Sequence, residues 1–315
     1  MATQSISKLP ILVRDAFKAA QKTGDLTFYQ TQVSILQFNG LPFQVRFSPA
    51  LAKKPKSNKP RDSKEVIDPF ADPPEGLFIA HLPSHNLVLN KFPIIPDHFI
   101  LATKVFKKQT DLLEEDDLDA AFECLRAYRE NGEELFCFFN SGEHSGASQP
   151  HRHLQFLPVE SMRSGIEKGQ SWEVMAELLT KTPKPNLPFA YFSHTLPESP
   201  SSTLLHETYI KLHNNAYQVV HGSRPTSLTT SISYNLGLTD RVMVLCPRAA
   251  DGIQIQDGNG DDIGLVALNG TVLGGTLLVK SEEEYSALCN DQSKLTDVLK
   301  AIGFPPSKVE HDGKL

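Results

Sequence analysis

The chain has 315 residues, of which 40% are hydrophobic and 22% charged, and its formal net charge is −6 with a pI near 6.0. Such a chain is an ordinary globular protein of one large domain or two modest ones, and its acidic balance argues against a nucleic-acid-binding scaffold. Because it has neither a signal-peptide-like N-terminus nor an apolar run of membrane length, and because its four cysteines lie far apart, we expect a cytoplasmic protein with reduced thiols, with access to the nucleus left open.

Apolar residues in the first part of the chain recur with the periods of helices and strands. In chain order the patterns are a helix at 11–22, strands at 33–38, 43–47, 77–81, 86–90 and 98–103, a helix at 114–128, and strands at 135–139 and 151–157. The turn pair Asn39-Gly40 predicts that the first two strands form a hairpin. The spacing of Leu118, Phe122 and Leu125 is that of a helix with one buried face. We therefore expect an α+β fold, with helices packed on an antiparallel sheet.

A basic segment, residues 53–61, interrupts these patterns with five cations and two prolines. Prolines and polar residues at this density predict a loop. The loop is either a solvated linker or a flap that brings Lys53 or Lys54 to the phosphates of a substrate, and the sequence alone leaves both interpretations open.

The second part of the chain follows a proline-rich stretch at 183–203, which we interpret as a linker or wrapping segment. The later patterns are a helix at 204–220, strands at 231–236 and 242–245, and helices at 281–289 and 294–302. Ser281 and Glu284 form a capping box for the first of the last two helices, and Gly303 ends the second. The sequence thus predicts an N-terminal catalytic part at 1–195 and a second, related or wrapping part at 204–315.

A faint internal repeat connects these two parts. Residues 85–89 and 234–238 share the pattern Asn-Leu-x-Leu, and an apolar strand follows each of them, at 98–104 and 242–248. Such self-similarity is typical of two related halves, although chance similarity of two strand pairs would look the same.

The stretch from Asn140 to Gln155 carries the strongest functional signal. It contains His151-x-His153-x-Gln155 directly after a loop of small and polar residues. Alternate residues of a strand point to the same face, so these three side chains would lie side by side. A loop rich in glycine and serine can offer N–H groups and hydroxyls to a phosphate. An imidazole beside such a loop favours nucleotidyl transfer through a histidine.

Two other interpretations of the histidine pair stay open at this point. The histidines could be metal ligands, but zinc takes three or four ligands and no Cys-x-x-Cys or His-x-x-x-His accompanies them, so no metal site is predicted. They could also be half-buried strand residues without chemistry. The neighbouring Asn-Ser-Gly and Gly-Ala-Ser-Gln sequences favour a functional site.

A second segment, residues 89–101, resembles the nucleoside-binding segment of the histidine-triad superfamily, in which an Asn contacts the ribose and Pro-x-x-Pro-x-His leads into the central strand. That superfamily has hydrolases with His-x-His-x-His and transferases with His-x-His-x-Gln, and Gln155 puts this chain with the transferases. The long form, the Ser-Gly-Ala-Ser-Gln-x-His-x-His-x-Gln signature and the second half are similar to the diadenosine tetraphosphate phosphorylase (ATP adenylyltransferase) family. The resemblance, from about residue 30 to the end, implies a histidine-triad-like α+β fold.

The resemblance also implies a nucleotidyltransferase that splits diadenosine tetraphosphate with phosphate into ATP and ADP, reversibly. His153 would attack the α-phosphate and become adenylylated, with its other ring nitrogen on a nearby backbone carbonyl. His151 would orient the site, and Gln155 would bond the transferred phosphate without acting as an acid or base. Arg152 would face away from the nucleophile, towards solvent or an acid. The implied substrate-binding residues are Lys53, Lys54, Asn90, Lys91, Asn140, Gly146, Ala147, Ser148, Gln149, Asn269, Gly270, Thr271, Thr276 and Lys280.

The implied partners are small molecules, namely dinucleoside polyphosphates, ATP, ADP and phosphate, with Mg²⁺ carried on the polyphosphate and no organic cofactor. A monomer is expected, without nucleic-acid or membrane partners. Three alternatives stay open. Gln155 argues against a dinucleoside polyphosphate hydrolase, and the lack of zinc-type spacing argues against a hexose-1-phosphate uridylyltransferase. In a non-catalytic nucleotide-sensing protein, His153 would serve only for binding.

Overall fold

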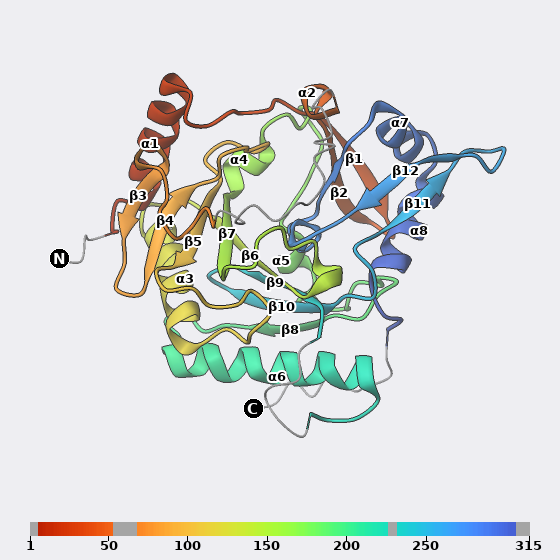
Figure 1. Cartoon of the computed structure of the whole chain (residues 1–315). Coiled ribbons are helices and arrows are strands. Elements are labelled where there is room, and N and C mark those ends of the chain that lie inside the picture. Colours follow the sequence, from red (N-terminus) through yellow and green to blue (C-terminus); the bar gives the residue numbers. More distant parts are fainter. Residues whose placement is uncertain (1–5, 53–67, 226–231, 307–315) are drawn as a thin grey trace, which may run out of the picture.

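The computed structural model describes residues 6–52, 68–225 and 232–306 (Figure 1). The first part contains α1 (Leu9–Thr23), β1 (Gln32–Phe38), β2 (Leu41–Phe47), α2 (Pro49–Ala52), η1 (Glu75–Leu77), β3 (Phe78–His81), β4 (His85–Leu89), β5 (Phe99–Thr103), α3 (Glu115–Glu130), β6 (Leu135–Ser141), η2 (Glu143–Ser145), β7 (His153–Pro158), α4 (Val159–Arg163) and α5 (Met175–Leu178). The second contains β8 (Phe192–Thr195), α6 (Ser202–His221), β9 (Tyr234–Leu238), β10 (Val242–Pro247), β11 (Gly252–Gln256), β12 (Asp262–Ala267), η3 (Gly270–Gly274), β13 (Thr276–Val279), α7 (Glu282–Asn290) and α8 (Gln292–Ile302).

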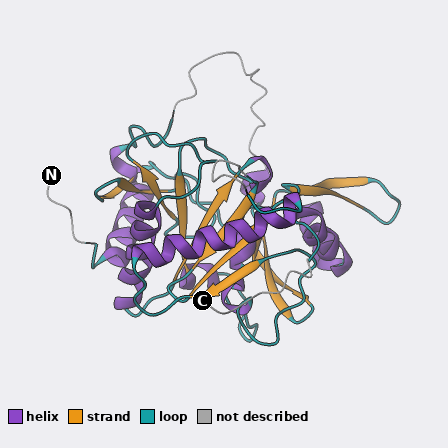
Figure 2. Cartoon of the chain, turned by 90° about the horizontal axis from the view of Figure 1, so that it is seen from below, coloured by secondary structure: helices purple, strands orange, loops and turns teal. Residues whose placement is uncertain are grey.

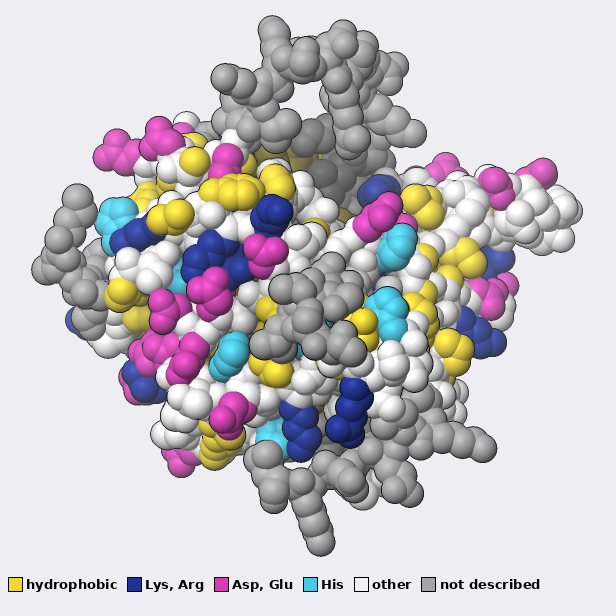
Figure 3. Space-filling model, turned by 60° about the horizontal axis from the view of Figure 1, so that its bottom comes forward, with side chains coloured by type: hydrophobic (Ala, Val, Ile, Leu, Met, Phe, Trp, Pro, Cys, Tyr) yellow, Lys and Arg dark blue, Asp and Glu magenta, His cyan; other side chains and the backbone are white. Residues whose placement is uncertain are grey.

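An antiparallel sheet of eight strands, in the order β3-β4-β5-β7-β6-β9-β10-β8, is the centre of the molecule. A smaller sheet has the order β1-β2-β13, in which β13 runs parallel to β2. Strands β11 and β12 form a hairpin that projects from the body and carries acidic side chains at its end (Figures 1 and 3). The predicted α+β fold with an antiparallel sheet is confirmed.

Helices cover one face of the large sheet, and the smaller sheet and short helices cover the other. Leu154 and Phe156 of β7 belong to an apolar core with residues of α3 and α6, whereas Leu157 belongs to a second core with residues of β2 and β13. Helix α6 crosses the helical face in Figures 1 and 2. Because side chains alternate along a strand, His153 and Gln155 project from the face opposite Leu154 and Phe156.

The predicted helices are confirmed, and the structure gives the reasons for their ends. Helix α1 ends at Gly24, whose φ of 83° lies in the left-handed region that glycine adopts without strain. Helix α3 starts with a capping box between Glu114 and Asp117, and α7 starts with one between Ser281 and Glu284.

The interpretation of residues 183–203 as a linker is wrong in part. Strand β8 lies within this stretch and pairs with β10 at the end of the large sheet. Helix α6 also begins in it, because the Ser201 hydroxyl accepts a hydrogen bond from Leu204 N. A four-residue strand surrounded by prolines has too few alternating residues to be recognised from sequence.

The continuity of the large sheet bears on the proposed division of the chain. Strand β6 of the first part pairs along Cys137–Ser141 with β9 of the second, so the sheet crosses between the parts, and the division at 195 and 204 stays a prediction. The repeated segments form the hairpins β4–β5 and β9–β10 of this sheet.

In the described part of the chain, no helix is long and apolar enough to cross a membrane. The basic segment 53–61, with Lys53 and Lys54, lies outside the described residues.

Candidate active site

His153 is the first residue of β7, where the strand lies between β5 and β6. It is paired with Ala102 of β5 and is only 3% exposed. Its Nδ1–H donates to the carbonyl oxygen of His151 at 2.8 Å. Among the described residues Nε2 has no hydrogen-bond partner, so in this tautomer it carries a free lone pair.

Burial determines the protonation state of this imidazole. It lowers the pKa of His153 to about 4, because the charged ring is poorly solvated between the strands. The ring of Phe70 contributes to this environment, since its centroid lies 5.0 Å from that of His153. At neutral pH His153 is therefore a neutral base with one available nitrogen, as a nucleophile requires.

His151 is held on both sides of its ring. Its Nδ1–H donates to Asp68 Oδ2 at 2.6 Å, and its Nε2 lies 2.8 Å from the carbonyl oxygen and 2.9 Å from the hydroxyl of Thr103. Strand 151–157 was predicted to begin at this residue, but His151 forms only an isolated bridge with Lys108, because β5 ends at Thr103. The sequence analysis predicted His151 as a site residue, but it did not identify Asp68 and Thr103 as the partners of its ring.

Gln155 belongs to a chain of side chains that starts in the nucleoside-like segment. Its Oε1 accepts from His98 Nε2 at 3.1 Å, and Asn90 Nδ2 donates to His98 Nδ1 at 3.0 Å. Burial lowers the pKa of His98 to about 4, so this histidine is also neutral. Because His98 occupies the amide oxygen, the NH₂ group of Gln155 is left to donate to a ligand. Lys91, beside Asn90, is exposed, with Nζ 5.8 Å from the centre of the Phe92 ring.

Gln109 bonds to both β6 and β7 at the point where these strands stop pairing. The sequence analysis did not identify this residue. Pairing of β6 with β7 ends at Phe138 and Gln155. Beyond that point Gln109 Oε1 accepts from His153 N at 2.8 Å, and its Nε2 donates to the carbonyl oxygens of Asn140 at 2.7 Å and His153 at 3.2 Å. One side chain thus replaces the missing strand pairing beside the nucleophile.

Asn140, near the end of β6, connects this strand to the second part of the chain. Its Oδ1 accepts from Gly270 N at 2.8 Å and from Asn235 Nδ2 at 2.9 Å. A Cβ at Gly270 would lie 2.7 Å from that oxygen, and a Cβ at Gly146 would lie 2.8 Å from Asn269 Cβ. Only glycine permits this approach. Predicted residues from both parts are therefore brought together, and Asn140 Nδ2 keeps no partner among the described residues.

The other predicted binding residues differ in how exposed they are and in whether their polar atoms already have partners. Gly146, Ala147 and Ser148 are exposed and Gln149 is partly exposed, so the loop can meet a ligand. The Asn269 oxygen caps η3 by accepting from the backbone and hydroxyl of Thr271. Thr276 is buried, and its hydroxyl lies 3.4 Å from the side-chain oxygen of Gln44, whereas Lys280 is exposed.

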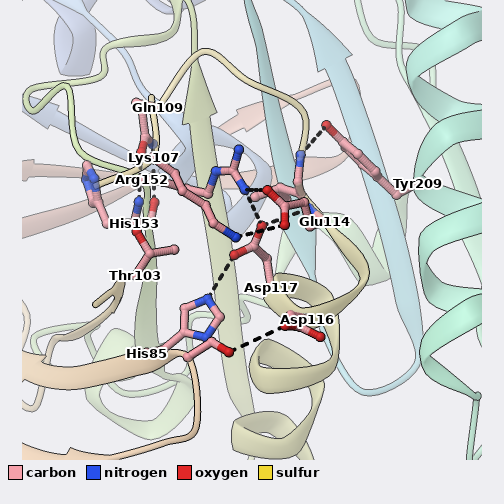
Figure 4. A network of polar contacts seen from close by, with 12 residues as sticks. His85, Thr103, Lys107, Gln109, Glu114, Asp116, Asp117, Arg152, His153 and Tyr209 are labelled. Atoms are coloured by element: carbon pink, nitrogen blue, oxygen red, sulfur yellow. Dashed lines mark hydrogen bonds and ion pairs between the residues drawn. The ribbon is translucent and has the colours of Figure 1, made fainter. Parts of the chain in front are cut away.

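Arg152 lies on the opposite face from the nucleophile, as predicted, and it meets acidic residues (Figure 4). Its Nη1 donates to Asp117 Oδ2 at 2.7 Å and to Glu114 Oε1 at 3.0 Å. His85 Nε2 donates to Asp117 Oδ1 at 2.8 Å. Burial opposes ionisation of Asp117, but these bonds outweigh it and keep the pKa of its carboxyl below the ordinary value. The network fixes β7 to α3 from behind the site.

Comparison with known proteins identifies the family to which this chain belongs. Residues 2–169 match the model of the Ap4A phosphorylase N-terminal domain (Ap4A is diadenosine tetraphosphate), and residues 185–305 match that of the ATP adenylyltransferase C-terminal domain. The chain belongs to the Ap4A phosphorylase family. It is 31% identical to the Saccharomyces cerevisiae protein diadenosine 5',5'''-P1,P4-tetraphosphate phosphorylase 2, over 93% of this chain and 94% of that one. It is 28% identical to Protein APA1 of the same yeast, with the same coverage.

Solved structures of this family agree with the fold described above. Yeast Ap4A phosphorylase Apa2 superposes with a TM-score of 0.77 at 26% identity, over 97% of this chain and 100% of that one. Its complex with Ap4A gives a TM-score of 0.74 at 26% identity, with the same coverage. The predicted family is therefore confirmed.

Proposed function

We propose that this chain is a nucleotidyltransferase that cleaves Ap4A with inorganic phosphate into ATP and ADP through an adenylyl-histidine intermediate. The observation that carries the proposal is the buried, neutral ring of His153, with Nδ1 on the His151 carbonyl and Nε2 free. Family membership supports the substrate, because the relatives are named for phosphorolysis of Ap4A.

The reaction has two displacements at one phosphorus atom. In the first, Nε2 of His153 attacks the α-phosphate, the P–N bond forms, and the bond to the β-phosphate oxygen breaks with loss of ATP. In the second, an oxygen of inorganic phosphate attacks the adenylyl group, the P–N bond breaks, and ADP leaves. Each step transfers the adenylyl group and exchanges one energy-rich bond to phosphorus for another, so its free-energy change is small and the reaction can run in both directions.

Hydrogen-bond donors around His153 are suited to the charge that moves in these steps. The Gln155 NH₂ group and Asn140 Nδ2 are left without partners among the described residues, and the exposed loop at Gly146 to Gln149 offers further donors. Donors held in place before the reaction stabilise a transition state without reorganisation. Mg²⁺ would be carried by the polyphosphate, since such ions bind substrate phosphates with few protein ligands. We also propose that the protein acts as a monomer in the cytoplasm.

A product assay separates this proposal from its alternatives. The protein is incubated with Ap4A with and without phosphate, and the nucleotides are separated. We expect ATP and ADP only when phosphate is present. AMP and ATP in both samples would instead identify a hydrolase, and tight binding without turnover would identify a nucleotide sensor.

A labelling experiment tests the intermediate. Ap4A labelled in adenine is mixed with the protein without phosphate, and the modified peptide is located by mass spectrometry. We expect the label on His153 and none in His153→Asn. His221→Asn, at an exposed end of α6, is the matched control and should label normally. A label on another residue would refute the nucleophile assignment.

A further inference from the structure

Two residues outside the histidine motif contact its histidines: Asp68 bonds to His151, and Phe70 lies against the rings of both His151 and His153. Asp68 Oδ2 accepts from His151 Nδ1 at 2.6 Å, and its Oδ1 accepts from Phe70 N at 2.9 Å. The centroid of the Phe70 ring lies 5.0 Å from that of His153 and 5.8 Å from that of His151. One short segment therefore connects the two rings.

The segment is anchored by packing. Phe70 is 6% exposed and forms an apolar cluster with Val88, Ile100 and Ala102. Ala102 is also the strand partner of His153. The anchor thus lies next to the nucleophile, and it fixes the carboxylate of Asp68, two residues earlier, at a defined place.

The position of His151 needs such support because it precedes β7. Its backbone has only an isolated bridge with Lys108, outside the regular pairing of the sheet. Its side chain is bonded on one edge to Thr103 and on the other to Asp68. Holding the ring on two sides also holds the residue's own carbonyl, which accepts the Nδ1–H of His153.

We propose that Asp68 is a positioning residue for adenylyl transfer. Its carboxylate fixes His151, and the carbonyl of His151 keeps His153 in the tautomer whose Nε2 is free to attack the phosphate. This inference rests on the proposed function. Loss of Asp68 would let His151 turn, and the His153 ring would lose its fixed tautomer and direction. A shift of about 1 Å at a reacting group can cost about 10²-fold in rate.

Single-turnover labelling by Ap4A measures this effect, because it gives a rate constant and an amplitude separately. We expect Asp68→Ala to slow adenylylation of His153 by about 10²-fold, with full amplitude, a parallel fall in kcat and little change in KM. Asp68→Asn should be intermediate, since its one oxygen replaces only one of the two carboxylate oxygens. Asp72→Asn, an exposed acid without a partner among the described residues, is the control and should react like the wild type.

The outcomes separate the inference from the function on which it rests. A wild-type rate in Asp68→Ala, or a reduced amplitude at an unchanged rate, would overturn the positioning role alone. Absence of label in the wild type would overturn the proposed function. Nitrogen-15 spectra of the histidine rings then give a test without turnover. The proton of His153 should reside on Nδ1 in the wild type and be shared between both nitrogens in Asp68→Ala, and an unchanged spectrum would refute the inference.

Discussion

At the residue scale, the surroundings of His153 determine both its charge and its direction. Burial keeps the ring neutral, and a single backbone carbonyl selects the nitrogen that carries the proton. The first effect depends on the packing of Phe70 and the strands, and the second on His151, which Asp68 holds through a hydrogen bond. The two effects share the segment 68–70, but different measurements report on them.

The pH dependence of adenylylation tests the first effect. Protonation removes the lone pair of Nε2, so the rate falls as pH drops through the pKa of His153, which burial lowers to about 4. We expect single-turnover rates for the wild type to be flat from pH 8 to about pH 5.5, well above that value and below the ordinary histidine pKa of about 6.5. Phe70→Ala admits water, raises this pKa and moves the fall to higher pH. A wild-type midpoint near 6.5 would contradict the burial argument.

Gln155 provides a second prediction at this scale. Its amide can donate to a phosphate but cannot accept a proton from water, whereas an imidazole can act as a general base. We expect Gln155→His to lower phosphorolysis by about tenfold or more and to raise the share of AMP formed without phosphate. The ratio of AMP to ADP is measured by chromatography. An unchanged ratio would mean that this position does not separate transfer from hydrolysis.

At the element scale, β7 connects the site to the helical face of the sheet. His153 and Gln155 project to one side, while Arg152 forms ion pairs with Asp117 and Glu114 on the other. The contacts from His85 and Arg152 to Asp117 are almost fully buried. A buried ion pair adds little net stability to the folded state, but removing one member leaves an uncompensated charge in the interior, which is strongly destabilising.

Unfolding in urea tests the importance of this network. We expect Asp117→Ala to lower the free energy of unfolding by about 3–5 kcal/mol, because Arg152 and His85 lose their partner in the interior. Glu123→Ala breaks the exposed pair with Arg126 and should cost less than about 1 kcal/mol. Equal effects of the two substitutions would show that the network does not hold β7 to α3.

The elements also explain what sequence alone can and cannot predict. Alternation along β7 is a local property, so the shared face of His153 and Gln155 follows from the residues themselves. The partners of these residues do not follow, because Asp68 and Gln109 reach the histidines across 83 and 44 residues of chain. Such bonds depend on where the segment before η1, which carries Asp68, and the loop after β5, which carries Gln109, are placed. His98 was visible in the Pro-x-x-Pro-x-His motif, but its bond to Gln155 depends on the pairing of β5 with β7.

At the scale of the whole molecule, the second part of the chain is built into the site. Arg248, which is almost fully buried, donates to Asn235 Oδ1, to Leu268 O at 2.9 Å and to Ile302 O at 3.0 Å. Asn235 in turn donates to Asn140 and to Ser145 O at 2.9 Å. A chain of bonds thus runs from the C-terminal helix to the loop beside His153.

This continuity predicts that residues 1–195 do not form an active protein alone. Without β9 and β10, the edge of β6 would be unpaired, β8 would have no partner, and the Gly270 contact to Asn140 would be lost. An unpaired apolar edge promotes aggregation. We expect residues 1–195 to be insoluble when expressed alone, and soluble and adenylylated by Ap4A when expressed together with residues 204–315. A soluble 1–195 fragment that adenylylates His153 at the rate of the full chain would show that the first part is an autonomous catalytic domain.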